Sequence, residues 1–343
     1  MEAELIGSPR TRRRRARLSV AISSVAISLA AISFVAHVAA QSGWVAQRRG
    51  EAGKDLNAIY FASDKRGWVA GDSGLVFRTE DGGKTWARQT TGTDESINDI
   101  YFRDKEEGYL LAGNKIRSTD DGGATWRQVH AFAAAEFNGA TPELYSVRFA
   151  TKKRGWIVGS VSRRDDVVDS LLLYTDDGGA SWLRRSLPVR FELLHLDFDG
   201  GKRGWIVGDR GTILHTEDAG ATWTRQESNT TATLYHVEFV DDENGWAIGE
   251  RSTILRTNDG GRTWAQVMSS TAGAGATLLS VAFVNKDEGW IVGRRGLIMR
   301  SSDGGRTWLK QESKTTQHLF ALFFKGKTGW AVGGDGLVLQ YER

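Results

Sequence analysis

One short motif recurs along the chain and constrains the fold more than any other feature. It reads Gly-Trp, or once Gly-Tyr, followed by two apolar residues and a small residue, and its copies are spaced by 40 to 49 residues. That interval is the length of one four-stranded propeller blade. The seven copies therefore predict seven blades. Their aromatic residues are Trp68, Tyr109, Trp156, Trp205, Trp246, Trp290 and Trp330.

Each copy is predicted to form four short strands. Apolar and aromatic runs alternate with Gly/Asp/Lys turns, which is typical of hairpins. An isolated sheet that is apolar on both faces would aggregate, whereas blades stacked around an axis bury those faces. We therefore predict an all-β fold, a seven-bladed β-propeller of four-stranded antiparallel blades over residues 41–343. In the first copy the expected strands are Leu56–Phe61, Gly67–Ala70, Leu75–Thr79 and Thr85–Gln89.

A second motif, Thr/Ser-x-Asp-x-Gly-x-Thr/Ser-Trp, follows the third expected strand in six copies. Its Asp can accept hydrogen bonds from backbone N–H groups ahead of it, and its Gly allows positive φ. The Trp then covers the turn with a large apolar surface. We interpret this Asp-box as structural. Its Asp/Trp pairs are Asp81/Trp86, Asp121/Trp126, Asp177/Trp182, Asp218/Trp223, Asp259/Trp264 and Asp303/Trp308.

The seventh copy ends at Arg343, before its fourth strand. The segment Gly43–Gln47 has the Trp-x-x-Gln spacing of that missing strand, as in Trp86 and Gln89. The N-terminal strand is therefore predicted to complete the last blade and remove its open edge.

The first forty residues read as a targeting segment. An uncharged run from Leu18 to Ala40 follows a basic patch, and Val38-Ala39-Ala40 resembles a signal-peptidase site. The 23-residue run is also long enough to stay in a bilayer as an N-terminal anchor and contact the membrane. Residues 1–40 are thus predicted to be a signal peptide or an anchor, and the rest to be exported to the periplasm, a lumen or the exterior. The basic patch contains Arg10, Arg12, Arg13, Arg14, Arg15 and Arg17.

Charge and cysteine content exclude several classes. Residues 1–40 carry a net charge of +4 and the whole chain +3, so the remainder carries −1 and has no basic field for nucleic acid. The absence of cysteine excludes disulfides, Cys-ligated metal and a lipid-modified N-terminal cysteine. We predict a monomer with no cofactor and no metal.

The alternation of Gly-Trp-x-Val-Gly with Leu-x-Arg-Thr-x-Asp-Gly-Gly-x-Thr-Trp resembles the photosystem II assembly and stability factor family, a member of the Asp-box (bacterial neuraminidase repeat) group. The resemblance covers residues 43–343. It implies a seven-bladed propeller that acts as an assembly chaperone on the lumenal or periplasmic side. There, the resemblance implies, an arginine-rich surface binds a newly made reaction-centre subunit. The expected partner is a protein client, an envelope or photosynthetic membrane protein.

Propellers bind ligands on the face that holds the turns between second and third strands and the connections between blades. An insertion at Ser160–Ser170 enlarges this face in the third copy. We predict an arc of arginines there that holds an acidic or C-terminal carboxylate group through bidentate contacts. The alternative is a solvated turn surface in which Asp and Glu neutralise each Arg. The predicted partner-binding residues are Arg163, Arg164, Arg210, Arg251, Arg294 and Arg295.

Two further sets are in phase with the repeat. Arginines that precede the Asp-box are interpreted as structural, stacking on Trp; they are Arg78, Arg117, Arg256 and Arg300. Aligned inner strands place Arg148, Asp197 and Glu238 at one position, with His195 and His236 two residues earlier. We expect these five to converge at the central channel, either as a site for metal or acid–base chemistry or as paired charges around water.

Asp-boxes also occur in carbohydrate enzymes, so the alternative is a carbohydrate-binding or glycoside-hydrolysing propeller. The Arg-Ile-Pro segment usual in sialidases is absent, and xyloglucan hydrolases typically use two propellers with a cleft between them, whereas one propeller fills this chain. Phosphate loops, nucleophile elbows and His-x-x-x-His motifs are also absent from the sequence. The sequence therefore favours a non-catalytic protein-binding scaffold.

Overall fold

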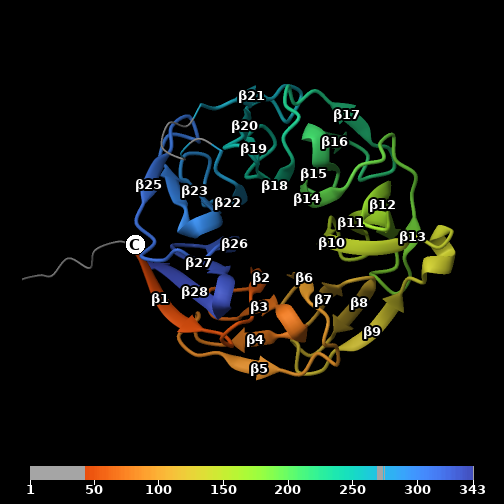
Figure 1. The fold of residues 1–343 in the computed structure, drawn as a ribbon, viewed down its shortest axis with the longest axis horizontal. Coiled ribbons are helices and arrows are strands. Elements are labelled where there is room, and N and C mark those ends of the chain that lie inside the picture. Colours follow the sequence, from red (N-terminus) through yellow and green to blue (C-terminus); the bar gives the residue numbers. More distant parts are fainter. Residues whose placement is uncertain (1–42, 269–272, 274, 343) are drawn as a thin grey trace, which may run out of the picture. The chain divides into compact units, whose positions relative to one another are not determined.

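The structure, a computed structural model, describes residues 43–268, 273 and 275–342. Residues 43–342 build seven four-stranded antiparallel sheets around a central axis (Figure 1). In each sheet the strand nearest the axis comes first and the strand at the rim last, except in blade seven. The predicted fold class is confirmed. The predicted signal peptide or anchor, residues 1–40, lies outside the described residues, and within the described part no helix is long and apolar enough to cross a membrane.

Strand bounds follow the repeat. Blade one has β2 (Leu56–Phe61), β3 (Gly67–Gly71), β4 (Val76–Thr79) and β5 (Ala87–Gln89); blade two β6 (Ile97–Phe102), β7 (Gly108–Ala112), β8 (Lys115–Thr119) and β9 (Arg127–Ala131); blade three β10 (Thr141–Phe149), β11 (Gly155–Arg163), β12 (Asp166–Thr175) and β13 (Leu183–Arg184); blade four β14 (Leu193–Asp199), β15 (Arg203–Gly208), β16 (Thr212–Thr216) and β17 (Thr224–Gln226). Blade five has β18 (Leu234–Phe239), β19 (Gly245–Gly249), β20 (Ile254–Thr257) and β21 (Ala265–Gln266); blade six β22 (Leu278–Phe283), β23 (Gly289–Gly293), β24 (Ile298–Ser301) and β25 (Leu309–Gln311); blade seven β26 (Leu319–Lys325), β27 (Thr328–Gly333), β28 (Leu337–Glu342) and β1 (Gly43–Arg49). Short 3-10 turns are η1 (Asp72–Gly74), η2 (Ala134–Phe137), η3 (Asp209–Gly211), η4 (Arg294–Gly296) and η5 (Gly334–Gly336).

The N-terminal strand closes the ring as predicted. β1 pairs antiparallel with β28, with Trp44 opposite Tyr341. Trp44 is 3% exposed, and its ring lies 5.3 Å from that of Tyr341 and edge-on to Phe324 at 6.0 Å. Because β1 covers the outer edge of β28, the last sheet has the four strands of every other blade.

The Gly-Trp motif joins each blade to the next. Trp68 is fully buried and stacks on Phe102 of the next inner strand at 3.5 Å, as Trp246 does on Phe283. The glycine before each Trp is needed because the Phe at the end of the preceding inner strand packs against it: a Cβ on Gly67 would overlap the ring of Phe61. These stacked pairs form the core between blades.

The Asp-box turns share one hydrogen-bond pattern. In blade one, Asp81 accepts hydrogen bonds from the Thr79 hydroxyl and from both the N–H and the hydroxyl of Thr85. The hydrogen bonds from Thr85 hold the pKa of Asp81 down at about 2. The other five carboxylates accept the same three bonds from the equivalent Thr or Ser residues; they are Asp121, Asp177, Asp218, Asp259 and Asp303.

The Asp-box tryptophans reach beyond the turns that they were expected to cover. Each ring packs edge-on against the Phe at or near the end of the inner strand in its own blade, with ring centres 5.7 to 6.1 Å apart and planes at 78° to 87°. These rings therefore contact the core as well as the turn. In five blades the same Phe also stacks on the Gly-Trp or Gly-Tyr aromatic of the preceding blade, whereas in blade four Trp223 itself packs edge-on against Trp156. The pairs are Trp86 with Phe61, Trp126 with Phe102, Trp182 with Phe149, Trp223 with Phe198, Trp264 with Phe239 and Trp308 with Phe283.

The indole N–H groups of these tryptophans do not share one partner. Those of Trp86 and Trp308 donate to glycine carbonyls of their own turns, whereas that of Trp264 donates to the Gln226 side chain of the preceding blade. The indole nitrogens that have no hydrogen-bond partner within the described residues are those of Trp126, Trp182 and Trp223. Apolar packing on Phe, rather than a hydrogen bond to the turn, is thus the contact common to all six.

Three strand boundaries differ from those expected in blade one, and the first is that β3 ends at Gly71 rather than Ala70. β5 begins at Ala87, not Thr85, because the Thr85 N–H bonds to Asp81 and is not available to the sheet. β4 begins at Val76 rather than Leu75, because the Leu75 N–H donates to the Asp72 carbonyl and closes η1.

The insertion in blade three extends two strands. It lengthens β11 and β12 into one hairpin, whose turn has positive φ at Arg164 and Asp165. The hairpin carries its tip beyond the equivalent turns of the other blades, because the added residues pair with one another.

Candidate functional site

Each blade places its turns at two opposite ends. Because the strands are antiparallel, the turn between strands two and three lies at the same end as the connection to the next blade. Hydrogen bonds join the two: Gly74 N–H donates to the Glu95 carbonyl, and Gly211 N–H to that of Ala232. We call this end of the ring the connection face, and the end with the turns between strands three and four the Asp-box face.

All six predicted partner-binding arginines lie on the connection face, and all six are exposed. Arg163 and Arg164 are at the tip of the β11–β12 hairpin, Arg210 is in η3, and Arg251 follows β19. Arg294 and Arg295 begin η4. The structure therefore brings residues from four consecutive blades to one face, as the sequence predicted; their role in binding remains a prediction.

These guanidinium groups have few contacts within the fold. The side chain of Arg210 is 70% exposed; its guanidinium lies 5.1 Å from the Phe191 ring and 3.8 Å from a carboxylate oxygen of Asp209. Arg251 donates one hydrogen bond, to the Thr231 hydroxyl at 3.2 Å. The side chains of Arg164 and Arg294 form no hydrogen bond or ion pair with the part of the chain that the structure describes. Most of their donors are therefore available to a partner.

Four of the six arginines occupy the left-handed backbone region. Their φ angles lie between 51° and 58°, where Gly, Asn and Asp are the residues most easily accommodated. The equivalent turns of blades one and seven place Ser73 and Asp335 there. A long cationic side chain is not required to form this turn, because Ser and Asp occupy the equivalent position in those two blades. The four are Arg164, Arg210, Arg251 and Arg295.

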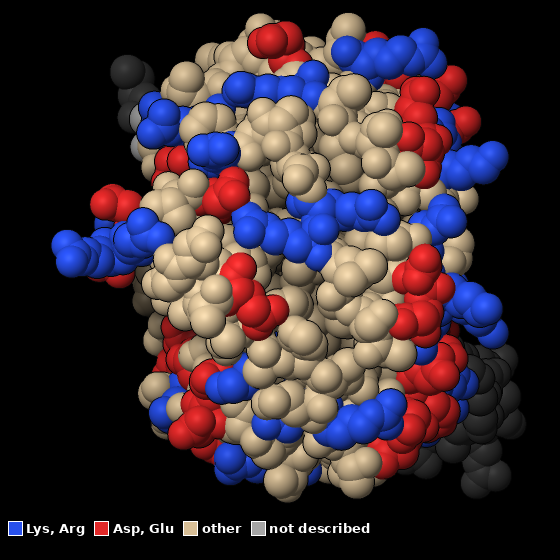
Figure 2. All heavy atoms as spheres, turned by 90° about the vertical axis from the view of Figure 1, so that its right-hand side faces the viewer, with Lys and Arg blue, Asp and Glu red and all other residues tan. Residues whose placement is uncertain are grey.

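The charge on the outside of the ring is divided into small groups. Figure 2 looks at the side of blade three and shows Lys and Arg side chains interspersed with Asp, Glu and uncharged residues. No continuous basic field covers this side of the described surface.

The inner strands converge on the axis, where they line a cavity of about 340 Å³. The Arg148 guanidinium donates to the Asp99 carboxylate at 2.7 Å and contacts Nε2 of His195 at 2.9 Å, and the rings of His195 and His236 stack at 3.8 Å. The predicted convergence is therefore confirmed. Sequence reasoning missed Asp99, although it occupies the same repeat position as His195 and could have been found from that alignment.

The two other predicted residues of the channel are buried carboxyl groups. Asp197 accepts hydrogen bonds from the N–H groups of Phe198 and Phe239, and Glu238 accepts one from Phe283 N–H in the next blade. Burial raises the pKa of Asp197 to about 6 and that of Glu238 well above its usual value. Within the described residues no group of three or more His, Cys, Asp or Glu is arranged to hold a metal ion.

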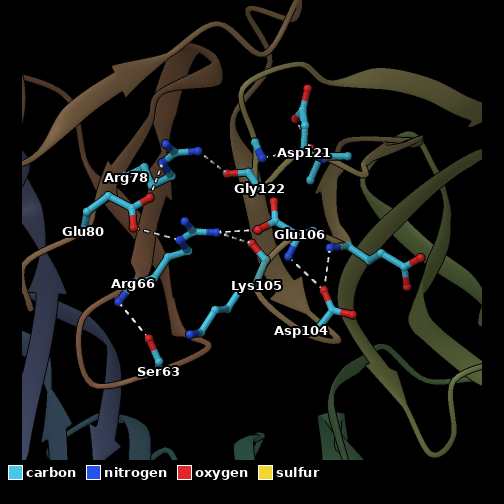
Figure 3. A network of polar contacts seen from close by, with 12 residues as sticks. Ser63, Arg66, Arg78, Glu80, Asp104, Lys105, Glu106, Asp121 and Gly122 are labelled. Carbon is cyan, nitrogen blue, oxygen red and sulfur yellow. Dashed lines mark hydrogen bonds and ion pairs between the residues drawn. The ribbon is translucent and has the colours of Figure 1, made fainter.

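The arginines on the Asp-box face link neighbouring blades. Arg66 donates to Glu80 of its own blade and to Glu106 and the Lys105 carbonyl of blade two, and Arg78 donates to the Gly122 carbonyl (Figure 3). Glu80 therefore lies between two guanidinium groups.

The structural interpretation of the second arginine set holds, but its expected geometry was wrong in part. Arg256 donates at 2.7 Å to the Gly304 carbonyl, which also accepts the Trp246 indole N–H. Arg117 donates to the Gly92 carbonyl at 2.6 Å, but it is not in phase with the other three arginines, because it lies opposite Leu110 and Ser118 occupies their position. Of the set, Arg300 lies over a tryptophan, with its guanidinium 5.4 Å from the Trp290 ring.

The Asp-box tryptophans are not part of an accessible site. Trp86, Trp126, Trp182, Trp264 and Trp308 are at most 8% exposed, and Trp223 is half-buried. Their rings are packed on phenylalanines inside the blades, so they do not offer a flat aromatic surface of the kind on which a sugar ring could stack. This packing supports their expected structural role, which remains a prediction.

Comparisons with known proteins identify the repeat. The sequence profile of the family described as "Photosynthesis system II assembly factor YCF48" matches residues 35–130, 89–182, 129–230, 223–314 and 268–342. A curated relative, "Photosystem II assembly lipoprotein Ycf48" of Synechococcus sp. (strain CC9902), is 32% identical over 106 residues. This match covers 31% of the chain and 28% of that relative.

Two solved structures show how widely the fold is shared. "YCF48 bound to D1 peptide" has a TM-score of 0.71 and 20% identity, and the match covers 88% of this chain and 95% of that one. A GH74 xyloglucanase from Xanthomonas campestris has a TM-score of 0.64 and 16% identity, over 86% of this chain and 53% of the enzyme. At these identities both similarities establish the propeller fold alone.

Proposed function

This chain belongs to the photosynthesis system II assembly factor YCF48 family, and from that membership we propose that it is a non-catalytic assembly factor that holds a protein client on its connection face. One observation carries the proposal: the family profile matches five overlapping segments that together run from residue 35 to residue 342. The matched repeat is the unit that builds all seven blades, so the resemblance is not confined to one local motif.

The proposed client is a photosynthetic membrane protein that presents an acidic segment or a terminal carboxylate. A similar solved structure is described as bound to a D1 peptide, which supports this class of client. Arginine binds carboxylates through two parallel hydrogen bonds. The exposed guanidinium groups of Arg210, Arg251 and Arg294 are the proposed donors.

We place this activity outside the cytoplasm. The curated relative is named a lipoprotein, which supports an exported location. The present sequence has no cysteine to carry a lipid, so residues 1–40 would supply either export or a membrane anchor.

The non-catalytic part of the proposal rests on the channel. Asp197 and Glu238, the carboxyl groups that a hydrolase would use, accept backbone N–H bonds that tie adjacent blades together. The similarity to the xyloglucanase extends over 53% of that enzyme and supports a shared fold, not a shared reaction.

The test measures binding of a fluorescent D1 peptide by anisotropy. A variant with Arg210→Glu, Arg251→Glu and Arg294→Glu should bind at least about tenfold more weakly, a change of about 1.4 kcal/mol or more. The matched control is Arg262→Glu, an exposed arginine in an Asp-box turn, which should bind like the unmodified protein. Equal affinity of the triple variant and the unmodified protein would reject the connection face as the client site.

A further inference from the structure

The central channel has two chemically different walls. At the fifth position of the inner strand, blades seven and one contribute Phe323 and Tyr60, whose ring centres are 5.3 Å apart. Blades four and five contribute Asp197 and Glu238 at that position. In a ring of seven, blade one lies opposite blades four and five, so Tyr60 faces the two carboxyl groups across the cavity.

Acidic side chains outnumber basic ones in the cavity. The lining residues include three carboxyl groups, on Asp99, Asp197 and Glu238, and one guanidinium, on Arg148. Arg148 is paired with Asp99 at 2.7 Å. No ion pair with a Lys or Arg of the described chain neutralises Asp197 or Glu238.

Other polar groups at the cavity also lack partners. Ser146 is 1% exposed and lines the cavity, and its hydroxyl has no hydrogen-bond partner within the described residues. Nδ1 of His236 is buried and likewise unpartnered there. Buried polar atoms are almost always hydrogen-bonded, so a bound polar group would complete this set.

We infer that the central channel is a binding site for an organic cation, an alkylammonium or guanidinium group, held between the Tyr60 and Phe323 rings and the carboxylates of Asp197 and Glu238. Aromatic rings attract cations through their faces, and carboxylates accept the N–H donors of the cation. A cavity of about 340 Å³ is at the lower end of ligand sites, which suits a small amine or one basic side chain. This site is separate from the proposed client face and does not depend on it.

Protonation supports the inference. Burial raises the pKa of Asp197 to about 6, and burial together with the nearby Asp197 raises the pKa of Glu238 well above its usual value. A cation stabilises the carboxylate forms, so its binding releases protons and strengthens as pH rises. The other titratable groups that line the cavity are Tyr60, Asp99, Tyr145, Arg148, His195, Tyr235 and His236, and Asp199 also acts on Asp197. Burial lowers the pKa of both histidines below the usual value.

The test titrates the full chain by calorimetry with n-butylammonium and methylguanidinium, with butyrate as the anionic control. We expect saturable binding of the cations, tighter at about pH 8 than at about pH 5, and no binding of butyrate. Asp197→Asn and Glu238→Gln should each weaken cation binding roughly tenfold. Ala282→Leu, which fills the channel from blade six and leaves both acids in place, should abolish it.

A further titration uses Nα-acetyl-lysine methylamide, which carries its ammonium on a peptide unit. Binding of this probe would identify a basic side chain as the ligand, and binding of the free amine alone would identify a small molecule. Cation affinity that is unchanged in Asp197→Asn, Glu238→Gln and Ala282→Leu, each shown to be folded by its thermal transition, would overturn the inference. So would equal binding of butyrate.

Discussion

Arginine has different surroundings on the two faces of this propeller. On the Asp-box face, Arg66 bonds to three acceptors in two blades, and Arg256 is bonded to a carbonyl of the next blade. On the connection face, Arg210 is 70% exposed and Arg164 has no side-chain partner among the described residues. The comparison teaches that the position of an arginine in the repeat, not its charge, decides whether its guanidinium is bonded within the fold or left exposed to solvent.

The largest effect is expected from a truncation that opens the ring and so disrupts both faces. A chain that begins at Arg48 loses Trp44, and burial of such a Trp contributes about 3–5 kcal/mol. It also exposes the edge of β28. We expect aggregation or loss of a cooperative thermal transition, and failure of both faces together. A chain that begins at Gln41, with Val45→Ala at an exposed position of β1, is the matched control and should melt normally. A native-like transition in the shorter chain would contradict the closure.

A double comparison should separate the faces. Asp259→Ala removes the acceptor for the Thr257 hydroxyl and for two groups of Thr263, so the free energy of unfolding should fall by about 2 kcal/mol. Client affinity of the folded protein should not change. Arg251→Ala should have the reverse effect. Its free energy of unfolding should stay within about 0.5 kcal/mol of that of the unmodified protein, and its affinity for the client should fall. Urea unfolding and peptide anisotropy measure the two, and loss of both properties in either variant would remove the contrast.

The pH dependence of stability should have opposite signs for the Asp-box carboxylates and for the buried acid Asp197 in the central channel. The folded pKa of Asp121 is depressed to about 2 by hydrogen bonds from Thr125, so its stabilisation is present above the unfolded value of 3.8 and is lost as pH falls toward 2. The folded pKa of Asp197 is raised by burial to about 6, so the folded state binds the proton more tightly and stability falls as pH rises from 3.8 to 6. Urea unfolding across this pH range should show the decrease in the free energy of unfolding, and the decrease should be smaller in Asp197→Asn. An unchanged profile in that variant would show that Asp197 does not titrate as the structure indicates.

The smallest expected effect concerns backbone strain. Asn tolerates the φ of 54° at Arg210 better than Arg does, so Arg210→Asn should stabilise the protein by about 0.5 kcal/mol while weakening client binding. Ser73→Asn, in the equivalent turn of blade one, should stabilise the protein by a similar amount and leave client binding unchanged. Thermal shift and anisotropy measure both variants. A loss of stability at Arg210 would mean that its guanidinium contributes to the fold.

Much of the fold was predictable because the repeat is strong. Six Gly-Trp motifs and one Gly-Tyr motif, in phase with six Asp-boxes, determine the number of blades, and the Trp-x-x-Gln spacing that begins at Trp44 identified the closing strand. Strand ends were less predictable: Thr85 has high β propensity, but its N–H bonds to Asp81 instead of a neighbouring strand. Whether a backbone N–H bonds to a side-chain acceptor or to a neighbouring strand depends on the three-dimensional geometry of the turn, which the sequence pattern does not specify.

The Asp-box tryptophans show the same limit. Their positions follow from the motif, but their common contact with an inner-strand Phe does not, because that Phe lies far from the turn in the sequence. Trp182 and Phe149 are one such pair. Nor does the motif distinguish Trp308, whose indole bonds to its own turn, from Trp264, whose indole bonds to another blade.

The candidate site was predictable in position but not in its interactions. Alignment of the inner strands brought Arg148, His195 and Asp197 to the channel, yet it did not identify Asp99 as the partner of Arg148. That ion pair joins blades two and three, and contacts between blades depend on how the sheets are rotated about the axis. For the same reason the sequence indicated stacking on Trp for Arg256, where the structure has a bond to a carbonyl.

The most direct test of the two-face account is hydrogen–deuterium exchange of the full chain with and without the D1 peptide. The account predicts slower exchange at the β11–β12 tip, η3 and η4, and no change in the Asp-box turns around Asp218 and Asp259. Protection confined to the Asp-box turns, with the connection face unchanged, would contradict it.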